Sequence, residues 1–320
     1  MMRAPLLLRP PVRELLGAIP VSLAIAWVLV VGAAVGSFLN VVIGRVPSGE
    51  SIVHPGSRCP RCKTPIRWYD NLPILSWLVL GGRCRACGGR ISARYPLVEA
   101  LGAAAALVAY ARHGLSAATA AEFALAAALL ALAFIDLDTW LLPNAITWPL
   151  IASGVILGAL GVTPAGSLRS AAYGAGLGFA AFALIAWVGE KVFKKEALGF
   201  GDVWLLAGLG AWMGPAALLP IALLGSLQGA VVGLVLIALG KGEPGPPQPT
   251  NLNPNPHSTA TAPPAPGPGP APPLPPPPDD IWVPPKHAVP FGPFLVAGAL
   301  EWLWLGALLA RAVPALELFR

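Results

Sequence analysis

Charged residues are scarce in this 320-residue chain. Asp, Glu, Lys and Arg together make up 11% of the sequence, while 56% of the residues are hydrophobic. An average soluble domain contains about 25% charged residues. So low a charged fraction excludes an ordinary soluble globular protein, and the composition indicates a membrane protein instead.

Cysteine is also rare, and its placement is regular. The four cysteines form two Cys-x-x-Cys pairs, Cys59 with Cys62 and Cys84 with Cys87, and 21 residues separate the pairs. This clustering argues against a secreted disulfide scaffold. Four thiolates at this spacing predict a tetrahedral zinc site. The metal would be structural, because four thiolates close its coordination shell and fold a loop too small to have its own core.

Long uncharged runs predict the membrane-spanning helices, since one crossing needs about 20 mostly apolar residues. We predict an all-α polytopic membrane protein with about eight transmembrane helices and a cytoplasmic zinc-knuckle loop. The first span is interpreted as a retained helix, with a cleaved signal peptide as the alternative, because its apolar run exceeds roughly 7–15 residues. The predicted spans are Leu15–Gly44, Tyr95–Ala111, Leu115–Ile135, Leu141–Gly161, Ser170–Val188, two helices within Val203–Gly240 divided at Met213-Gly214-Pro215, and Val289–Ala310.

Basic residues give the predicted orientation. Nine Lys and Arg residues lie in 45–94, against only two acidic residues. By the positive-inside rule this loop is cytoplasmic. Counting the crossings then places Asp136, Asp202 and the lysines of 191–195 on the same side. Arginines near the N-terminus run against this orientation, and the more strongly basic loop is expected to decide it.

Composition divides the chain into five predicted parts. Nineteen of the 37 prolines lie in 244–285, a composition that cannot bury a core and predicts a disordered, partly polyproline-II linker. A spacer role is favoured over a docking segment for it. The parts are a first transmembrane helix in 1–44, the four-cysteine zinc loop in 45–94, transmembrane helices 2–7 with the aspartates in 95–241, the Pro-rich linker in 242–286, and the last transmembrane helix in 287–320.

Three aspartates border the predicted spans, although a carboxylate near hydrocarbon costs several kcal/mol in many estimates. Asp136 and Asp138 are two residues apart and would point roughly 200° apart on a helix, so only one can face Asp202. Asp136 directly follows an apolar run and is the predicted partner, while Asp138 is expected to cap the helix or meet a headgroup. Two facing carboxylates cannot both ionise comfortably, and such a pair supports acid–base hydrolysis without a covalent intermediate.

The glycines Gly199 and Gly201 precede Asp202. They lack a Cβ, so an extended substrate backbone could approach closely there. The alternative is a turn that needs a positive φ, with Asp202 only capping the following helix. Of the other acids in or near spans, Glu99 and Glu122 are interpreted as solvated or paired. Glu301 lies inside the last span and is interpreted as a structural hydrogen-bond partner of a neighbouring helix.

Taken in order, these segments closely resemble the bacterial type IV prepilin peptidases, the prepilin leader peptidase/N-methyltransferases. The resemblance covers nearly the whole chain except the linker. It rests on "GSFLNVVIGRVP" at 36–47, "SRCPRC" and "CRAC" around the cysteines, "ISARYPLVE" at 91–99, "FIDLDTWLLPN" at 134–144, "GFGD" at 199–202 and "VPFGPFLVAGA" at 289–299.

The resemblance implies an eight-helix intramembrane aspartic peptidase of the GxGD type, with Asp136 and Asp202 as its catalytic acids. Its substrates would be type IV prepilins or pseudopilins, cut after a glycine at the end of a short basic leader on the cytoplasmic face. It also implies N-methylation of the new N-terminus with S-adenosylmethionine, for which no soluble-type nucleotide fingerprint occurs here. Two departures are Asn144, where many members carry Asp, and the Pro-rich insertion before the last helix.

The expected setting is the bacterial inner (cytoplasmic) membrane, with membrane lipid around the chain and no nucleic acid partner. Two alternatives remain at this point. A transporter could use the buried aspartates as a proton relay, although no internal repeat is visible. A non-enzymatic zinc-loop scaffold would tolerate Asp202→Asn.

Overall fold

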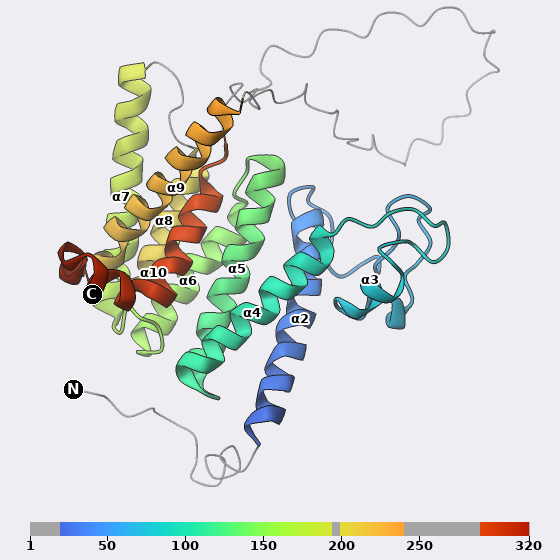
Figure 1. Ribbon diagram of the computed structural model, residues 1–320. Helices are drawn as coiled ribbons and strands as arrows, with labels where there is room; N and C mark the ends of the chain where they lie inside the picture. The colour runs from blue at the N-terminus through green and yellow to red at the C-terminus, as the bar shows by residue number, and fades with distance from the viewer. Residues whose placement is uncertain (1–19, 194–198, 240–288, 320) are drawn as a thin grey trace, which may run out of the picture. The chain divides into compact units, whose positions relative to one another are not determined.

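The computed structural model describes residues 20–193, 199–239 and 289–319. Within these ranges the chain is helical, with two isolated β-bridges and no strand (Figure 1). The predicted all-α class is therefore confirmed. The helices are α2 (Val21–Arg45), α3 (Leu75–Val79), α4 (Arg94–His113), α5 (Ala117–Thr139), α6 (Asn144–Ala159), α7 (Leu168–Phe193), α8 (Phe200–Met213), α9 (Leu218–Ala238) and α10 (Gly292–Ala312), with 3-10 turns η1 (Trp68–Asn71), η2 (Pro215–Ala217) and η3 (Pro314–Phe319).

Each predicted span corresponds to one of these helices, from α2 and α4 through α10. Five apolar helical segments are long enough to cross a membrane, namely α2, α5, α7, η2 with α9, and α10, whereas α6 and α8 are shorter apolar helices. The chain is thus a multi-pass membrane protein, and the count of eight crossings stays a prediction. The predicted break is confirmed, because α8 ends at Met213 and Gly214 follows with a φ of +81°.

Some sequence predictions fall on residues outside the described ranges. These are the Pro-rich linker, the start of the first span, and the lysines at 194 and 195. Among the described residues, those up to Gly229 and from Pro290 onward form one compact unit, and a second unit begins at Ala230. All contacts discussed below lie within the first unit.

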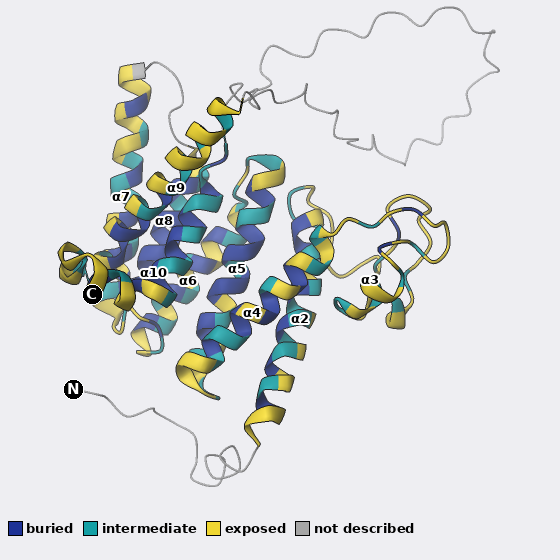
Figure 2. Cartoon of the chain, in the orientation of Figure 1, coloured by how far each residue is buried: buried dark blue, intermediate teal, exposed yellow. Residues whose placement is uncertain are grey.

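Helices α5 and α8 carry most of the core. Leu129 of α5 and Leu209 of α8 are fully buried, and Figure 2 shows α8 largely in the colour of buried residues. By contrast, large apolar side chains such as Trp27, Leu184 and Leu227 are exposed on α2, α7 and α9. Exposed apolar surface on this scale is what a lipid environment accommodates and water does not.

Small residues bring α7 and α8 into close contact. A Cβ built on Gly174 would lie 2.1 Å from the carbonyl oxygen of Gly210, and one on Gly178 would lie 2.5 Å from that of Leu206. Within a bilayer no hydrophobic force drives helices together, so close backbone approach through glycine is a main source of their association. This contact fixes α8, and therefore Asp202, against the rest of the unit.

Replacing Gly174 by Val is expected to push α7 away from α8. Inserting carbon atoms into a filled contact costs roughly 1–3 kcal/mol, and here the neighbour is rigid backbone. The thermal midpoint of the purified protein in detergent should fall clearly. Gly176→Val is the matched control, because it lies on the same helix with no atom within 4 Å of its Cβ position, and it should leave the midpoint unchanged. Equal midpoints for the two variants would contradict this packing.

Candidate functional site

The two aspartates predicted as partners lie at neighbouring helix ends. Asp136 is in the last turn of α5 and Asp202 is in the first turn of α8, and their exposed fractions are only 5% and 8%. The side chain of Leu142 lies against Gly201, next to Asp202, and also near Gly292, whose N–H bonds to Asp136, so the two acids border the same side chain. The structure thus brings the predicted pair together within the core.

A backbone amide of a third helix orients Asp136. The N–H of Gly292, the first residue of α10, donates a hydrogen bond to Oδ2 of Asp136 at 3.1 Å. Amides at a helix N-terminus lack an intrahelical acceptor and favour anionic partners. A Cβ on Gly292 would lie 2.5 Å from the same oxygen, so only glycine allows this approach.

Asp202 has different surroundings. Its Oδ1 is buried and has no hydrogen-bond partner among the described residues. Gly199 is the residue before α8, with φ −66°, and no side chain caps this helix end. The alternative of a positive-φ turn with Asp202 as a simple helix cap is therefore wrong. A buried oxygen without a partner costs roughly 1–3 kcal/mol or more, and among the described residues only Thr147 and Thr163 have a buried side-chain oxygen in the same condition.

Leu142 links the surroundings of both carboxylates. A Cβ on Gly201 would lie 2.8 Å from Cβ of Leu142, and a Cβ on Gly292 would lie 3.4 Å from its Cδ1. The space left by Gly201 is therefore filled by a side chain of this chain. At Gly199, by contrast, Oδ2 of Asp202, at 3.9 Å from the Cβ position, is the only atom of the described residues within 4 Å. Substrate approach remains a prediction, and Gly199 is the position with open space for it.

Asp138 lies outside the pair. Nη1 of Arg94 donates hydrogen bonds to the Asp138 carboxylate, at 2.7 Å to Oδ1 and 2.6 Å to Oδ2. The Asp138 side chain is half-exposed. The Arg94 guanidinium also lies over the Phe134 ring, 4.9 Å from its centroid. Asp138 is thus far more exposed than Asp136. Its partner is an arginine at the start of α4 rather than a helix end or a headgroup.

The other carboxylates in or near the spans, of which Glu99 and Glu122 are buried and Glu301 is partly buried, are paired. Glu301 accepts Nε2 of Gln228 on α9 at 2.8 Å, which confirms the predicted bond to a neighbouring helix. Glu99 accepts the backbone N–H of Ile74 at 2.7 Å and so joins α4 to the cysteine loop. Glu122 has the most partners of the three glutamates. Its carboxylate contacts Arg112 at 3.0 Å and His113 at 2.7 Å, and it accepts a hydrogen bond from Nε1 of Trp304 at 3.0 Å.

The four cysteines converge on one point. All four sulfur atoms lie within 4.8 Å of one another, with 3.9 Å between Cys59 and Cys87 and 4.0 Å between Cys62 and Cys84. Zinc–sulfur bonds of about 2.3 Å in a tetrahedron place the sulfurs about 3.8 Å apart, so this donor set fits a zinc ion. The hydrogen bond with the Thr64 hydroxyl lowers the pKa of Cys62 to about 6, whereas the pKa of Cys87 in the same cluster is raised to about 11.

Two tight turns present the cysteines. In each Cys-x-x-Cys turn a backbone N–H donates to the carbonyl oxygen of the first cysteine. Lys63 donates to Cys59 and Gly88 donates to Cys84, both at 2.9 Å. Gly88 has a φ of +66°, a backbone conformation that glycine adopts without strain. An ion pair between Arg85 and the Asp70 carboxylate, at 2.7 Å, also stabilises the loop. The hydrogen bonds from Arg85 hold the pKa of Asp70 below its usual value.

Buried aspartates at the ends of apolar helices, beside a four-cysteine loop, define a multi-pass membrane protein with the parts of an aspartic hydrolase. Residues 30–113 match the bacterial peptidase A24 N-terminal domain, and residues 123–234 match the type IV leader peptidase family. The chain belongs to this family of prepilin leader peptidases. The resemblance predicted from its motifs is confirmed.

Relatives in several bacteria support the assignment. A prepilin leader peptidase/N-methyltransferase of Myxococcus xanthus is 42% identical over 312 residues, covering 90% of this chain and 92% of the relative. One of Burkholderia pseudomallei is 38% identical, with coverages of 68% and 78%. A type 4 prepilin-like proteins leader peptide-processing enzyme of Escherichia coli is 42% identical, with coverages of 64% and 82%. No solved structure matches this chain.

Substitution of Gly292 by Ala tests the orientation of Asp136. The added methyl group would displace the carboxylate that lies 2.5 Å away. We expect turnover of a prepilin leader, the reaction named for the relatives, to fall by roughly 10²-fold, since misplacement by about 1 Å can have this effect. Gly306→Ala on the same helix is the control, because its nearest atom is 3.3 Å away on Trp302. Unchanged turnover in Gly292→Ala would contradict the proposed contact.

Metal analysis tests the cysteine site. Protein purified under reducing, chelator-free conditions should contain one zinc ion per chain, measured by elemental analysis. Cys62→Ser should lower this content and destabilise the loop, because a four-ligand structural site contributes directly to local folding. Ser57→Ala lies in the same loop but is not a metal ligand. It controls for zinc that is lost during purification. Metal-free wild-type protein with an intact fold would refute the zinc assignment.

Proposed function

We propose that this protein is a membrane-embedded aspartic endopeptidase that removes the short basic leader from type IV prepilins or pseudopilins at the cytoplasmic face. The observation that carries the proposal is the burial of both Asp136 and Asp202, with Oδ1 of Asp202 lacking a hydrogen-bond partner in the part of the chain that the structure describes. Membership in the leader peptidase family supports the same reaction.

The chemistry needs one carboxylate as base and one carboxylic acid. The base removes a proton from water, and the water oxygen bonds to the carbonyl carbon of the scissile peptide. The acid then gives its proton to the amide nitrogen as the carbon–nitrogen bond breaks. The Gly292 amide fixes one oxygen of Asp136 and thus the orientation of that carboxylate. No covalent intermediate with the protein is required.

The substrate would reach the pair in an extended form. Among the described residues, only Oδ2 of Asp202 comes within 4 Å of the Cβ position of Gly199, and this supports an approach of the leader backbone there. Burial of the pair among apolar helices limits bulk water, which strengthens the electrostatic action of both carboxylates on the developing charge. The Pro-rich segment 242–286 contains neither aspartate and is proposed to act as a spacer.

A second step, N-methylation of the new N-terminal amine, is part of the proposal because the relatives carry this activity in their names. S-adenosylmethionine would supply the methyl group as a co-substrate. Zinc at the four cysteines would hold the loop together and take no part in either reaction, since its shell is closed. The proposed setting is the bacterial inner membrane. A proton-relay transporter gains no support from the relatives, which are named for leader processing.

The aspartates can be tested by charge-neutral substitution. Asp136→Asn and Asp202→Asn should each lower leader cleavage by roughly 10³-fold or more, because a pair that shares a proton loses its function when either member is replaced. Leader loss from a purified prepilin, followed by mass spectrometry, measures the rate, and membrane insertion of each variant is checked in parallel.

Asp138→Asn is the matched control. It removes the same charge two residues away, and its half-exposed ion pair with Arg94 contributes about 0–1 kcal/mol. Cleavage should therefore stay within about threefold of wild type. An inactive Asp138→Asn together with an active Asp136→Asn would overturn the assignment of the pair.

A further inference from the structure

The loop between α2 and α4 exposes a group of large apolar side chains, which we call the α3 patch. Its members are Trp68 in η1, Leu72 directly after η1, and Leu75, Leu78 and Val79 in α3. The exposed fractions run from 43% for Leu72 to 81% for Val79, and η1 packs against α3. Exposed apolar side chains that gather in one place indicate a binding surface.

Helix α3 has two different faces. The three members of the patch on this helix follow the i, i+3, i+4 spacing, which places them on one face. The opposite face bears the half-buried Trp77, whose Nε1 donates to the carbonyl oxygen of Ile91 at 3.2 Å. A Cβ on Gly82 would lie 2.9 Å from the ring of Trp77. Trp77 therefore holds α3 to the rest of the loop, and the apolar face points away from it.

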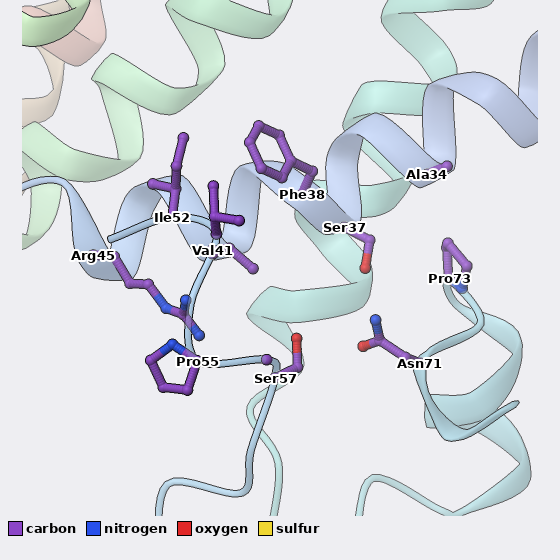
Figure 3. A pocket seen from close by; sticks show the side chains of 12 residues that line it. Ala34, Ser37, Phe38, Val41, Arg45, Ile52, Pro55, Ser57, Asn71 and Pro73 are labelled. Carbon is purple, nitrogen blue, oxygen red and sulfur yellow. The ribbon is translucent and has the colours of Figure 1, made fainter. Parts of the chain in front are cut away.

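The patch lies beside α2 rather than beyond its end. Ile74, the residue before α3, donates its N–H to the carboxylate of Glu99 on α4 at 2.7 Å. A Cβ on Gly36 of α2 would lie 2.6 Å from Cα of Glu99, so Ile74 is level with Gly36. Figure 3 shows the same relation, with Pro73 of the loop facing the part of α2 that carries Ser37.

Helix dimensions give the depth of this level in the membrane. Gly36 lies about 13 Å of helix before Arg45, the last residue of α2. The 25 residues of α2 are about 37 Å long, whereas the hydrocarbon core is about 30 Å thick. Even if the whole excess of about 7 Å lay at the Arg45 end, Gly36 would be about 6 Å inside the hydrocarbon. Helices that lie in a membrane interface bury their apolar face by about 5–10 Å.

The loop that carries the patch is basic. Residues 45–94 contain nine Lys and Arg against two acids, and one of these acids, Asp70, is paired with Arg85 at 2.7 Å. Zinc held by four thiolates adds a charge of about −2, which leaves the loop at about +5. Arg83 and Arg90 are exposed and adjoin in an isolated β-bridge after α3. Basic residues beside exposed apolar and aromatic ones are the combination that binds anionic lipid.

We propose that the α3 patch docks on the anionic lipid surface of the membrane that the chain itself spans, with its apolar side chains at the boundary between headgroups and acyl chains. Lipid is the occupant because Phe38 on α2 and Leu97 on α4, at the same level, are exposed apolar residues of the spans, and because the charge of the loop complements anionic headgroups. The bond from Ile74 to Glu99 and the docked patch together hold the four-cysteine loop at a fixed height beside α2 and α4.

Site-specific photocross-linking tests this contact in the full-length, zinc-loaded protein. Val79 is replaced by benzoylphenylalanine, and the protein is reconstituted in nanodiscs of phosphatidylcholine and phosphatidylglycerol. After irradiation and digestion, mass spectrometry should find a phospholipid attached to the α3 peptide. The yield of this adduct should fall at least about twofold in nanodiscs of phosphatidylcholine alone, because the electrostatic part of the attraction is then lost.

The matched control carries benzoylphenylalanine at Arg58, an exposed position of the same loop within the polar stretch around the first cysteine pair. It should give no phospholipid adduct. A second variant adds Leu78→Glu to the protein labelled at Val79, and the adduct yield should fall at least about tenfold, because a carboxylate is excluded from the acyl region. Ala86→Glu makes the same charge change at an exposed position outside the patch, and its yield should stay within about twofold.

Zinc content, measured on every variant, shows whether the loop remains folded. If Leu78→Glu loses its zinc, the lipid comparison and the Arg58 control decide the outcome. Equal phospholipid adducts at Val79 and Arg58, or a yield that Leu78→Glu leaves unchanged in a zinc-loaded protein, would contradict docking. An adduct at Val79 with a prepilin or with another part of this chain, in place of phospholipid, would show that the patch binds protein and that the proposal is wrong.

Discussion

The burial of two carboxylates in an apolar helix bundle is the constraint around which the site is built. Each buried acid requires either a donor or a chemical role, because an unpaired polar group in such surroundings is destabilising. Asp136 receives a backbone donor from Gly292, whereas Oδ1 of Asp202 has no partner among the described residues. Leu142 packs against the glycines beside both acids. Three segments distant in sequence are thereby required to meet at one place.

Much of this arrangement could be predicted from the sequence. Uncharged runs gave the helices because a membrane span has a fixed length, and the break after Met213 followed from Gly214 and Pro215. The spacing of the four cysteines predicted a convergent set of ligands. The preference for Asp136 over Asp138 followed from its position after an apolar run, and the structure buries Asp136 and leaves Asp138 half-exposed.

The contacts that were missed depend on tertiary structure. Gly292 lies 156 residues from Asp136, and nothing in its local sequence indicates a hydrogen bond to that carboxylate. The resemblance of the segment 289–299 to the family's last helix was the only signal near it. The pairing of Asp138 with Arg94 was equally hidden, because it joins the end of α5 to the start of α4. Gly201 was interpreted as leaving space for a substrate, but the side chain of Leu142 fills the space that a Cβ at Gly201 would occupy.

The central claim is that Asp136 and Asp202 act as one unit. It is tested most directly by comparing the residual leader cleavage of Asp136→Asn and Asp202→Asn with that of the double variant, using long incubations and mass spectrometry. Residues that act together are strongly non-additive, so the double variant should cleave no more slowly than either single variant. If the two losses instead multiply in the double variant, the aspartates act independently and the account of a shared pair is wrong.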